Sequence, residues 1–192
     1  MKTWLRYSLA ALVGVATGTG LAVQTIRSGA MGDQLRSGAW STGRDVGTAD
    51  ADAKTRAVVA LRGLLALPKS EAKYFIAVED DAGRPLSGKC NYLVSGGVLD
   101  ARWWSITRYD IAGWLLPNRW EKHSIGSAAI PADRQANWQI MVGPEPRPGL
   151  WIPTATDGRF DLTLRAYHPH GAIVDDPERA MLPRIVRQEC RS

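Results

Sequence analysis

Four polar side chains in the sequence have the chemistry of a catalytic or ligand-binding site: Asp110, Asn118, His123 and Arg165. A carboxylate and an imidazole can transfer protons, whereas an amide and a guanidinium can orient or neutralise a substrate. Such a site works only where the side chains converge in one cleft. The sequence has no glycine-rich phosphate loop, no Gly-x-Ser-x-Gly elbow and no His-Glu-x-x-His motif. We therefore favour a non-catalytic binding module and keep an enzyme as the alternative.

Aromatic side chains are the second candidate feature, since the chain has 8 tryptophans but only 2 phenylalanines. Trp103 and Trp104 are adjacent, so in a strand one enters the core while the other faces outward or into a groove. Exposed indole rings stack on sugar rings and apolar ligands. Trp104, Trp151 and Tyr167 therefore join the candidate ligand-binding residues. The interpretation that we favour for the tryptophans as a set is that the indoles fill the core of a small domain.

The sequence predicts neither a metal site nor a cofactor. His168 and His170 flank Pro169, but two imidazoles without a nearby third ligand make a poor metal site. Carboxylates are too numerous for any pair of them to indicate a glycosidase.

An apolar segment at the N-terminus predicts where the chain is located. From Tyr7 to Ile26 no residue is charged, and this length crosses ~30 Å of hydrocarbon as a helix. Lys2 and Arg6 precede the segment, as is typical of a cytoplasmic flank. We predict a transmembrane anchor over residues 1–27, with the rest of the chain exported, and a cleaved signal sequence is the alternative. The membrane is thus the first expected partner.

The net charge of +5 does not indicate a nucleic-acid partner. The basic excess lies mainly in the first 45 residues, where it flanks the apolar segment. A nucleic-acid-binding protein would be expected to concentrate positive charge on its folded domain.

Cys90 and Cys190 are the only cysteines. Beyond an export signal, an even pair favours a disulfide, which would close a long loop and hold the C-terminal tail. The alternative is a pair of unpaired buried thiols.

The exported part divides into a glycine-rich linker over residues 28–48 and a folded domain over residues 49–192. A helix is predicted to open the domain, because Asp50 and Asp52 suit a helix N-terminus and Pro68 suits its end. The apolar residues at helical spacing are Ala53, Ala57, Leu61, Leu64 and Leu65.

After this helix the period of the apolar residues changes from 3.6 to 2. Short apolar runs between glycine and proline turns predict a mainly β domain, an antiparallel jelly-roll-like sandwich. The predicted strands are Lys73–Glu79, Lys89–Val94, Trp103–Tyr109, a short piece near Trp114–Leu116, Asn137–Val142, Phe160–Tyr167 and Arg184–Arg187. In the strand Phe160–Tyr167, Leu162 and Leu164 alternate with Arg165 and Tyr167, so the polar face is expected to meet solvent.

Several stretches together resemble a known family: SEAKYFIAVEDDAGRPLSGKCNYLV, ARWWSITRYD, LLPN and LWIPTATDGRFDLTLRAYHP. Residues 40–190 are similar to the domain of unknown function family 1214, most closely to its short exported members with one N-terminal membrane segment. The resemblance implies a jelly-roll β-sandwich without an established activity. It also supports the disulfide, because both cysteines match cysteines of the short members. Residues on family motif positions are Tyr74, Asp81, Gly83, Cys90, Tyr92, Trp104, Ser105, Thr107, Tyr109, Asp110, Asn118, Trp151, Pro153, Arg165, Tyr167 and Pro169.

One position departs from the family pattern. The family reads Asn-Trp-Leu-Pro where this chain has Leu150-Trp-Ile-Pro153. A ligand role of that asparagine would be lost here, whereas Gly149 could compensate for a turn-closing role. We predict a single-pass protein of a bacterial inner membrane with its domain in the periplasm, or a secreted domain after cleavage. An envelope glycan, lipid or protein is the expected partner, and an enzyme acting on such carbohydrate or lipid remains the alternative.

Overall fold

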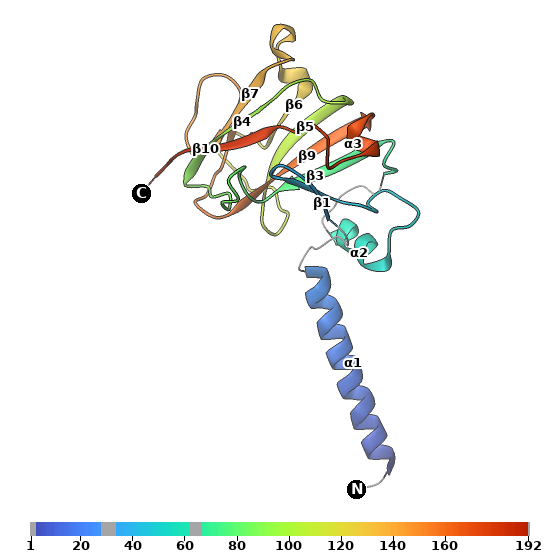
Figure 1. Cartoon of the computed structure of the whole chain (residues 1–192). Coiled ribbons are helices and arrows are strands. Elements are labelled where there is room, and N and C mark those ends of the chain that lie inside the picture. The colour runs from blue at the N-terminus through green and yellow to red at the C-terminus, as the bar shows by residue number, and fades with distance from the viewer. Residues whose placement is uncertain (1–2, 28–33, 62–66, 192) are drawn as a thin grey trace.

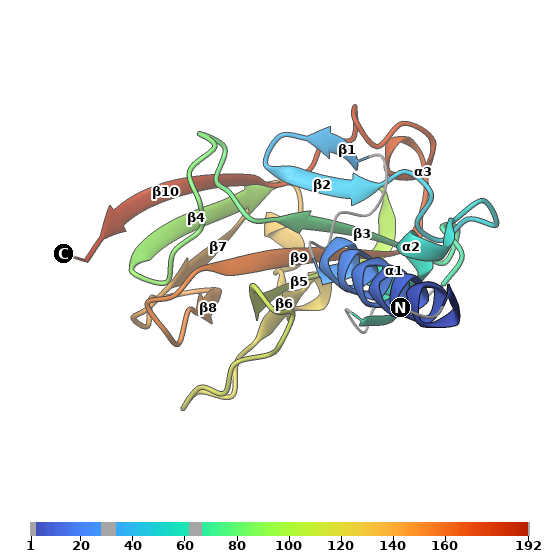
Figure 2. The same cartoon turned by 90° about the horizontal axis from the view of Figure 1, so that it is seen from below.

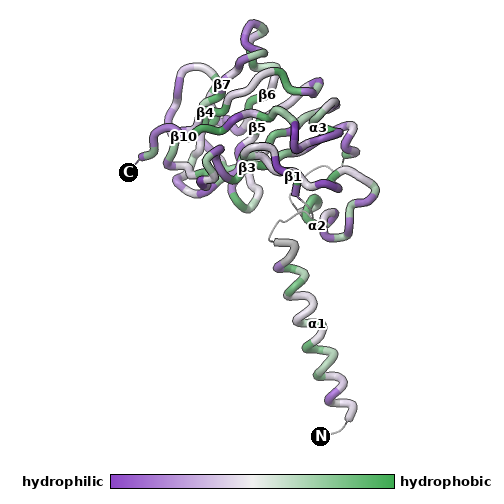
Figure 3. Tube along the Cα trace, in the orientation of Figure 1, coloured by the Kyte–Doolittle hydropathy of each residue, from purple (hydrophilic) through white to green (hydrophobic). Residues whose placement is uncertain are grey.

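The computed structural model describes residues 3–27, 34–61 and 67–191 of the chain (Figure 1). Helix α1 (Thr3–Arg27) projects from the β-rich domain as a single long rod. Its segment Arg6–Gln24 is long and apolar enough to cross a membrane, and none of it is buried inside the structure. Figure 3 shows the apolar residues along this exposed helix as well as inside the domain.

The domain consists of two packed sheets, which confirms the predicted mainly β sandwich. The six-stranded sheet has the order β1-β2-β3-β9-β5-β6, and the four-stranded sheet has the order β10-β4-β7-β8 (Figure 2). All strand pairs are antiparallel except β7 with β8. The strands are β1 (Gln34–Ser37), β2 (Trp40–Gly43), β3 (Ala72–Ala77), β4 (Cys90–Gly96), β5 (Ala101–Asp110), β6 (Ser124–Gly126), β7 (Trp138–Gly143), β8 (Trp151–Pro153), β9 (Phe160–Pro169) and β10 (Arg184–Cys190).

The core lies between the two sheets, where the inward residues of the long strands meet. Leu162 and Leu164 of β9 are fully buried there, so the apolar half of the predicted alternation is confirmed. Trp104 of β5 and Trp138 of β7 meet across the core, with ring centroids 4.5 Å apart. The large indole rings thus supply part of the core packing of this domain.

The polar face of β9 is not the solvent-facing surface that its alternation predicted. Asp161 and Thr163 are each only 4% exposed. They lie on a central strand between β3 and β5, and Tyr74 and Tyr109 of those strands extend over the same face. Large neighbouring side chains therefore shield the short polar ones from water.

Helix α2 (Ala53–Leu61) packs against this outer face of the six-stranded sheet. Val58 and Val59 belong to a smaller hydrophobic cluster that also contains Ala72, Tyr74 and Ile76 of β3. Of the residues predicted to form the apolar face, Ala53 is exposed and Ala57 is half-buried, whereas Leu64 and Leu65 lie outside the described residues.

The N-terminus of α2 is capped as its acidic residues predicted. Asp52 Oδ1 accepts the backbone N–H of Thr55 at 2.6 Å. This hydrogen bond is the main reason that the pKa of Asp52 is lowered.

Residues 34–43 form the β1–β2 hairpin, so the interpretation of residues 28–48 as a linker is wrong over this stretch. Gly38 has a φ of 59° and makes the tight turn between the strands. Trp40 is 1% exposed in the core, and its Nε1 donates to the carbonyl of Pro183 at 2.6 Å. Gly38, one of the glycines that suggested flexibility, therefore builds a hairpin turn instead.

Three further strand assignments differ from the prediction. The piece near Trp114–Leu116 lies in an irregular loop, because Trp114 and Leu115 are exposed and pair with no strand. The short strands β6 and β8 were missed; each has three residues, too few to show a period of 2.

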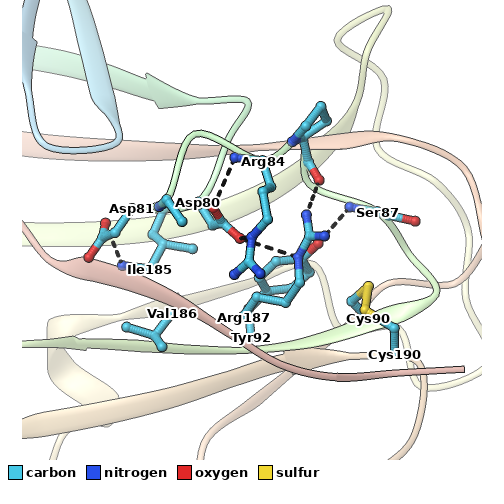
Figure 4. A network of polar contacts seen from close by, with 12 residues as sticks. Asp80, Asp81, Arg84, Ser87, Cys90, Tyr92, Ile185, Val186, Arg187 and Cys190 are labelled. Carbon is cyan, nitrogen blue, oxygen red and sulfur yellow. Dashed lines mark hydrogen bonds and ion pairs between the residues drawn. A yellow bond between two sulfur atoms is a disulfide. The ribbon is translucent and has the colours of Figure 1, made fainter.

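A disulfide and an ion-pair network hold β10 in place (Figure 4). Cys90 and Cys190 are paired with a Cα–Cα distance of 3.9 Å, which confirms the predicted disulfide. Asp80, in the turn after β3, accepts the backbone N–H groups of Ala82 and Arg84 and forms ion pairs with the guanidinium groups of Arg84 and Arg187. The last strand is thus joined covalently to β4 and electrostatically to that turn.

Candidate functional site

The predicted polar site residues Asp110 and Asn118 both build turns in the loop between β5 and β6. Asp110 Oδ1 accepts the N–H groups of Ala112 at 3.0 Å and Trp114 at 2.8 Å. Asn118 Oδ1 accepts those of Trp120 at 3.1 Å and Lys122 at 3.2 Å. These side chains are therefore engaged with the backbone, and this accounts for them without a ligand.

The same loop brings two other predicted residues together. Asn118 Nδ2 lies 3.4 Å from His123 Nδ1, beside an edge-to-face pair of Trp120 and Trp151 with ring centroids 4.8 Å apart. Lys122 Nζ lies 5.9 Å from the Trp151 ring centroid, within cation–π range. Asn118, His123 and Trp151 thus form one cluster, in which Trp151 is buried by Trp120 rather than open to a ligand.

Arg165 and Tyr167 lie elsewhere, on the outer face of the six-stranded sheet. Arg165 donates to the hydroxyl of Tyr109 at 2.7 Å and lies over the rings of Tyr109 and Tyr74. The pKa of Tyr74 is raised, chiefly by burial and further by Tyr167, while Arg165 opposes the shift. Tyr167 packs against Trp103 at 5.3 Å. The arginine therefore joins β9 to its neighbours β3 and β5.

Trp104 belongs to the core, so the predicted site residues occupy separate parts of the molecule. Three cavities of the structure are described in the next paragraphs. None of them is lined by the predicted polar residues Asp110, Asn118, His123 and Arg165. Among the described residues no group of three histidine, cysteine, aspartate or glutamate side chains is placed to hold a metal ion. The arrangement gives no support to acid–base chemistry by these four side chains.

The largest of these cavities is an apolar groove beside α2, which we call the α2 groove. Its volume is about 670 Å³. Its lining is mainly apolar and consists of Val59 and Ala60 of α2, Val46 and Ala49 of the preceding segment, and Pro68. Arg56 also lines the groove. The sequence analysis missed these residues because it assigned part of them to a linker. Their run of small apolar residues around a short helix was the available signal.

A smaller cleft of about 300 Å³ lies beside Trp103. Arg102, Ser127 and Gln135 give it polar groups, and Trp103 is 39% exposed. A Cβ at Gly126 would lie 2.7 Å from the Trp103 ring, so this glycine makes room for the indole. Trp103, rather than the predicted Trp104, is the outward member of the pair. The third cavity, about 320 Å³, lies over the outer face of β7 near Met141 and Leu150.

Arg108 is a polar residue that the sequence analysis did not single out. It is 1% exposed, and its guanidinium nitrogens have no hydrogen-bond partner among the described residues. Burial lowers its pKa, and Asp110 and Asp161 oppose the shift. Arginine remains charged in proteins, and a buried charge without hydrogen bonds lowers the free energy of unfolding. A leucine at this position would raise it instead.

Fold and cavities together define a two-sheet β-sandwich behind an N-terminal apolar helix, and the part of the chain that the structure describes does not bring the four predicted polar residues into one cleft. Residues 71–171, more than half of the chain, match the family model described as "Protein of unknown function (DUF1214)". The chain belongs to this family, as the sequence motifs indicated.

One solved structure agrees with this fold assignment. The VPA0106 protein of Vibrio parahaemolyticus superposes with a TM-score of 0.60 at 22% identity, over 93% of this chain. The chain spans 44% of that protein's length. A protein of Burkholderia cenocepacia gives a TM-score of 0.41 at 17% identity, over 64% of this chain and 31% of its own. No curated protein matches the chain.

Proposed function

We propose that this chain is a membrane-anchored, non-catalytic binding module of the bacterial envelope, and that its α2 groove takes a lipid acyl chain. The domain would lie on the periplasmic side of the inner membrane. Support for this side comes from the disulfide, because such bonds persist in oxidising compartments. Retention of α1 as an anchor, rather than its cleavage, is part of the proposal.

The position of the α2 groove is the observation that carries the ligand assignment. The C-terminal end of α1 lies next to α2 (Figure 1), so the groove is on the side of the domain from which the candidate membrane span leaves. Lipid tails are the most abundant apolar molecules at that place. The groove has a volume of about 670 Å³ and a mostly apolar lining, which suits part of one acyl chain.

A crosslinking experiment tests the groove in the full chain. The protein is placed in lipid nanodiscs with a phospholipid that carries a photoactivatable group on its acyl chain, and crosslinked peptides are mapped by mass spectrometry. We expect crosslinks in α2 and in residues 46–51 in addition to those in α1. Crosslinks confined to α1 would contradict the lipid assignment.

Two matched substitutions on α2 make the test specific. Ala60 lines the groove and Ala53 does not, although both are exposed alanines of the same helix. Ala60→Trp should fill the groove and reduce the α2 crosslinks several-fold, whereas Ala53→Trp should leave them unchanged. Equal effects of the two substitutions would show that the crosslinks arise outside the groove.

The cleft beside Trp103 supports a second candidate, contact with an envelope glycan. Its exposed indole and its polar groups Arg102 and Gln135 match the mixed stacking and hydrogen bonding that sugars require. An enzyme acting on carbohydrate or lipid has less support, because no carboxylate or histidine is among the described residues that line this cleft. The two sites are separable, since Ala60→Trp does not alter the cleft.

A further inference from the structure

The structure contains the same turn twice, once after β3 and once after β5. In the first, Asp80 N–H donates to Arg84 O at 2.9 Å and Gly83 N–H to Asp80 O at 2.9 Å. In the second, Asp110 N–H donates to Trp114 O at 2.9 Å and Gly113 N–H to Asp110 O at 2.9 Å. Both glycines have positive φ, 73° and 88°.

The aspartate side chains also act alike in the two turns. Asp80 Oδ1 accepts N–H groups two and four residues later, from Ala82 and Arg84, each at 3.0 Å. Asp110 Oδ1 accepts those of Ala112 and Trp114, as described above. The sequences Asp-Asp-Ala-Gly-Arg and Asp-Ile-Ala-Gly-Trp thus specify one backbone geometry.

The two turns differ in what their side chains meet. In the first turn, Asp81 receives the N–H of Ile185 and the guanidinium of Arg184, which fastens the turn to β10. In the second turn, the corresponding residue Ile111 is 65% exposed, Trp114 is 71% exposed and Leu115 is 46% exposed. A rigid turn therefore presents three large apolar side chains to solvent, at the start of the loop that projects beyond both sheets in Figure 2.

The size and chemistry of this apolar tip favour a lipid surface over a protein partner. A stable protein interface takes about 20–30 residues a side, whereas the tip offers three. Tryptophan with neighbouring aliphatic residues is typical of the membrane–water interface, and basic residues nearby favour anionic headgroups. Arg119 and Lys122, both exposed, follow in the same loop and outnumber its one acidic residue, the exposed Glu121.

We infer that the apolar tip, Ile111 with Trp114 and Leu115, inserts into the headgroup region of the bilayer that holds α1. The inference rests on the anchoring by α1 that is proposed above. The domain would then touch the membrane at two places, and the tip would fix its orientation on the tether.

Fluorescence quenching in nanodiscs tests this contact with an internal control. Ala112→Cys and Ala82→Cys, each in the chain with its disulfide intact, are labelled with an environment-sensitive dye. The two positions occupy equivalent places in the two turns. Discs of phosphatidylcholine and phosphatidylglycerol carry a nitroxide lipid. We expect quenching at position 112 to exceed that at position 82 by at least about twofold, as for a residue in the interface.

A swap of the turn sequence separates insertion from misfolding. Ile111→Asp with Trp114→Arg gives the second turn the residues of the first, which the fold already accommodates. We expect an unchanged thermal midpoint and quenching at position 112 that falls to the level of position 82.

Three results would overturn the inference, and they are distinguishable. Equal quenching at positions 82 and 112, in chains that co-elute with the discs, rejects the tip contact and leaves the anchor intact. A chain that does not stay with the discs rejects the anchor and the tip contact together. A blue shift at position 112 that grows with the number of chains per disc, without nitroxide quenching, assigns the tip to a second copy of the chain.

Discussion

At the scale of single residues, the balance between burial and hydrogen bonding decides which charges stabilise the domain. The Asp80 side chain is 1% exposed. Burial alone would raise its pKa, but the backbone N–H groups of Arg84 and Ala82 and the Arg84 guanidinium outweigh burial, and its pKa is lowered. Arg108 has the same degree of burial without such partners among the described residues. Asp80 therefore stabilises the folded state, whereas the charge of Arg108 opposes folding.

The stability from Asp80 should depend on pH in a defined direction. Because its pKa is lower in the folded state than in the unfolded state, the contribution is complete above the unfolded value of about 3.9 and is lost as pH falls through the folded value. Asp80→Asn should lower the free energy of unfolding by about 2 kcal/mol at pH 7, as for hydrogen bonds to a charged group. The difference from wild type should shrink below about pH 4 in urea titrations.

Asp157→Asn is the control for this prediction, since Asp157 forms an exposed ion pair with Arg191. It should change the free energy of unfolding by less than about 1 kcal/mol. A difference between Asp80→Asn and wild type that persists unchanged to pH 2 would contradict the role assigned to the Asp80 carboxylate.

At the scale of secondary-structure elements, the length of a strand decided whether the sequence revealed it. The six- to ten-residue strands β3, β5 and β9 give apolar or alternating runs long enough to be recognised, and they were predicted close to their true bounds. Strands β1, β2, β6 and β8 have three or four residues, and partners remote in sequence or a tight turn specify them. The candidate site was harder to predict, because turn-building by Asp110 and Asn118 and binding by the same side chains use the same residue types.

Trp40 shows that the β1–β2 hairpin is part of the folded domain. Its indole is buried in the core and bonded to Pro183. Trp40→Ala should therefore lower the free energy of unfolding by about 3–5 kcal/mol, measured by chemical denaturation. Trp114→Ala, which removes an exposed indole, should change it by less than about 0.5 kcal/mol. If Trp40→Ala left the free energy of unfolding unchanged, residues 34–43 would contribute nothing to the stability of the domain, as expected of a linker.

At the scale of the whole molecule, one covalent bond and one helix set the limits of the domain. The disulfide joins residues 100 positions apart and secures β10 at the edge of the four-stranded sheet. At the other end, α1 connects the domain to the proposed membrane side. The α2 groove and the apolar tip would bring the same domain into contact with lipid, so anchoring, ligand and orientation are linked in a single proposal.

Removal of the disulfide should weaken the whole domain. Cys90→Ala with Cys190→Ala releases a constraint on the unfolded chain, and the chain-entropy model gives a loss of about 4–5 kcal/mol for a loop of this length. Denaturation curves of oxidised wild type, reduced wild type and the double variant measure the loss. The reduced and double-variant curves should agree with each other; coincidence of all three would show that the bond contributes nothing.

The separation of the two cysteines also has a consequence for biogenesis. If the domain crosses the membrane during synthesis, Cys90 emerges 100 residues before Cys190, an interval of roughly 5–20 s at typical translation rates. During that time β4 lacks its β10 neighbour, Asp80 lacks Arg187, and the Cys90 thiol is open to an oxidant or to the Cys90 of another nascent chain. The Cys90–Cys190 disulfide and the pairing of β10 with β4 therefore form last. Conditions that slow translation should increase disulfide-linked dimers before they affect the finished domain.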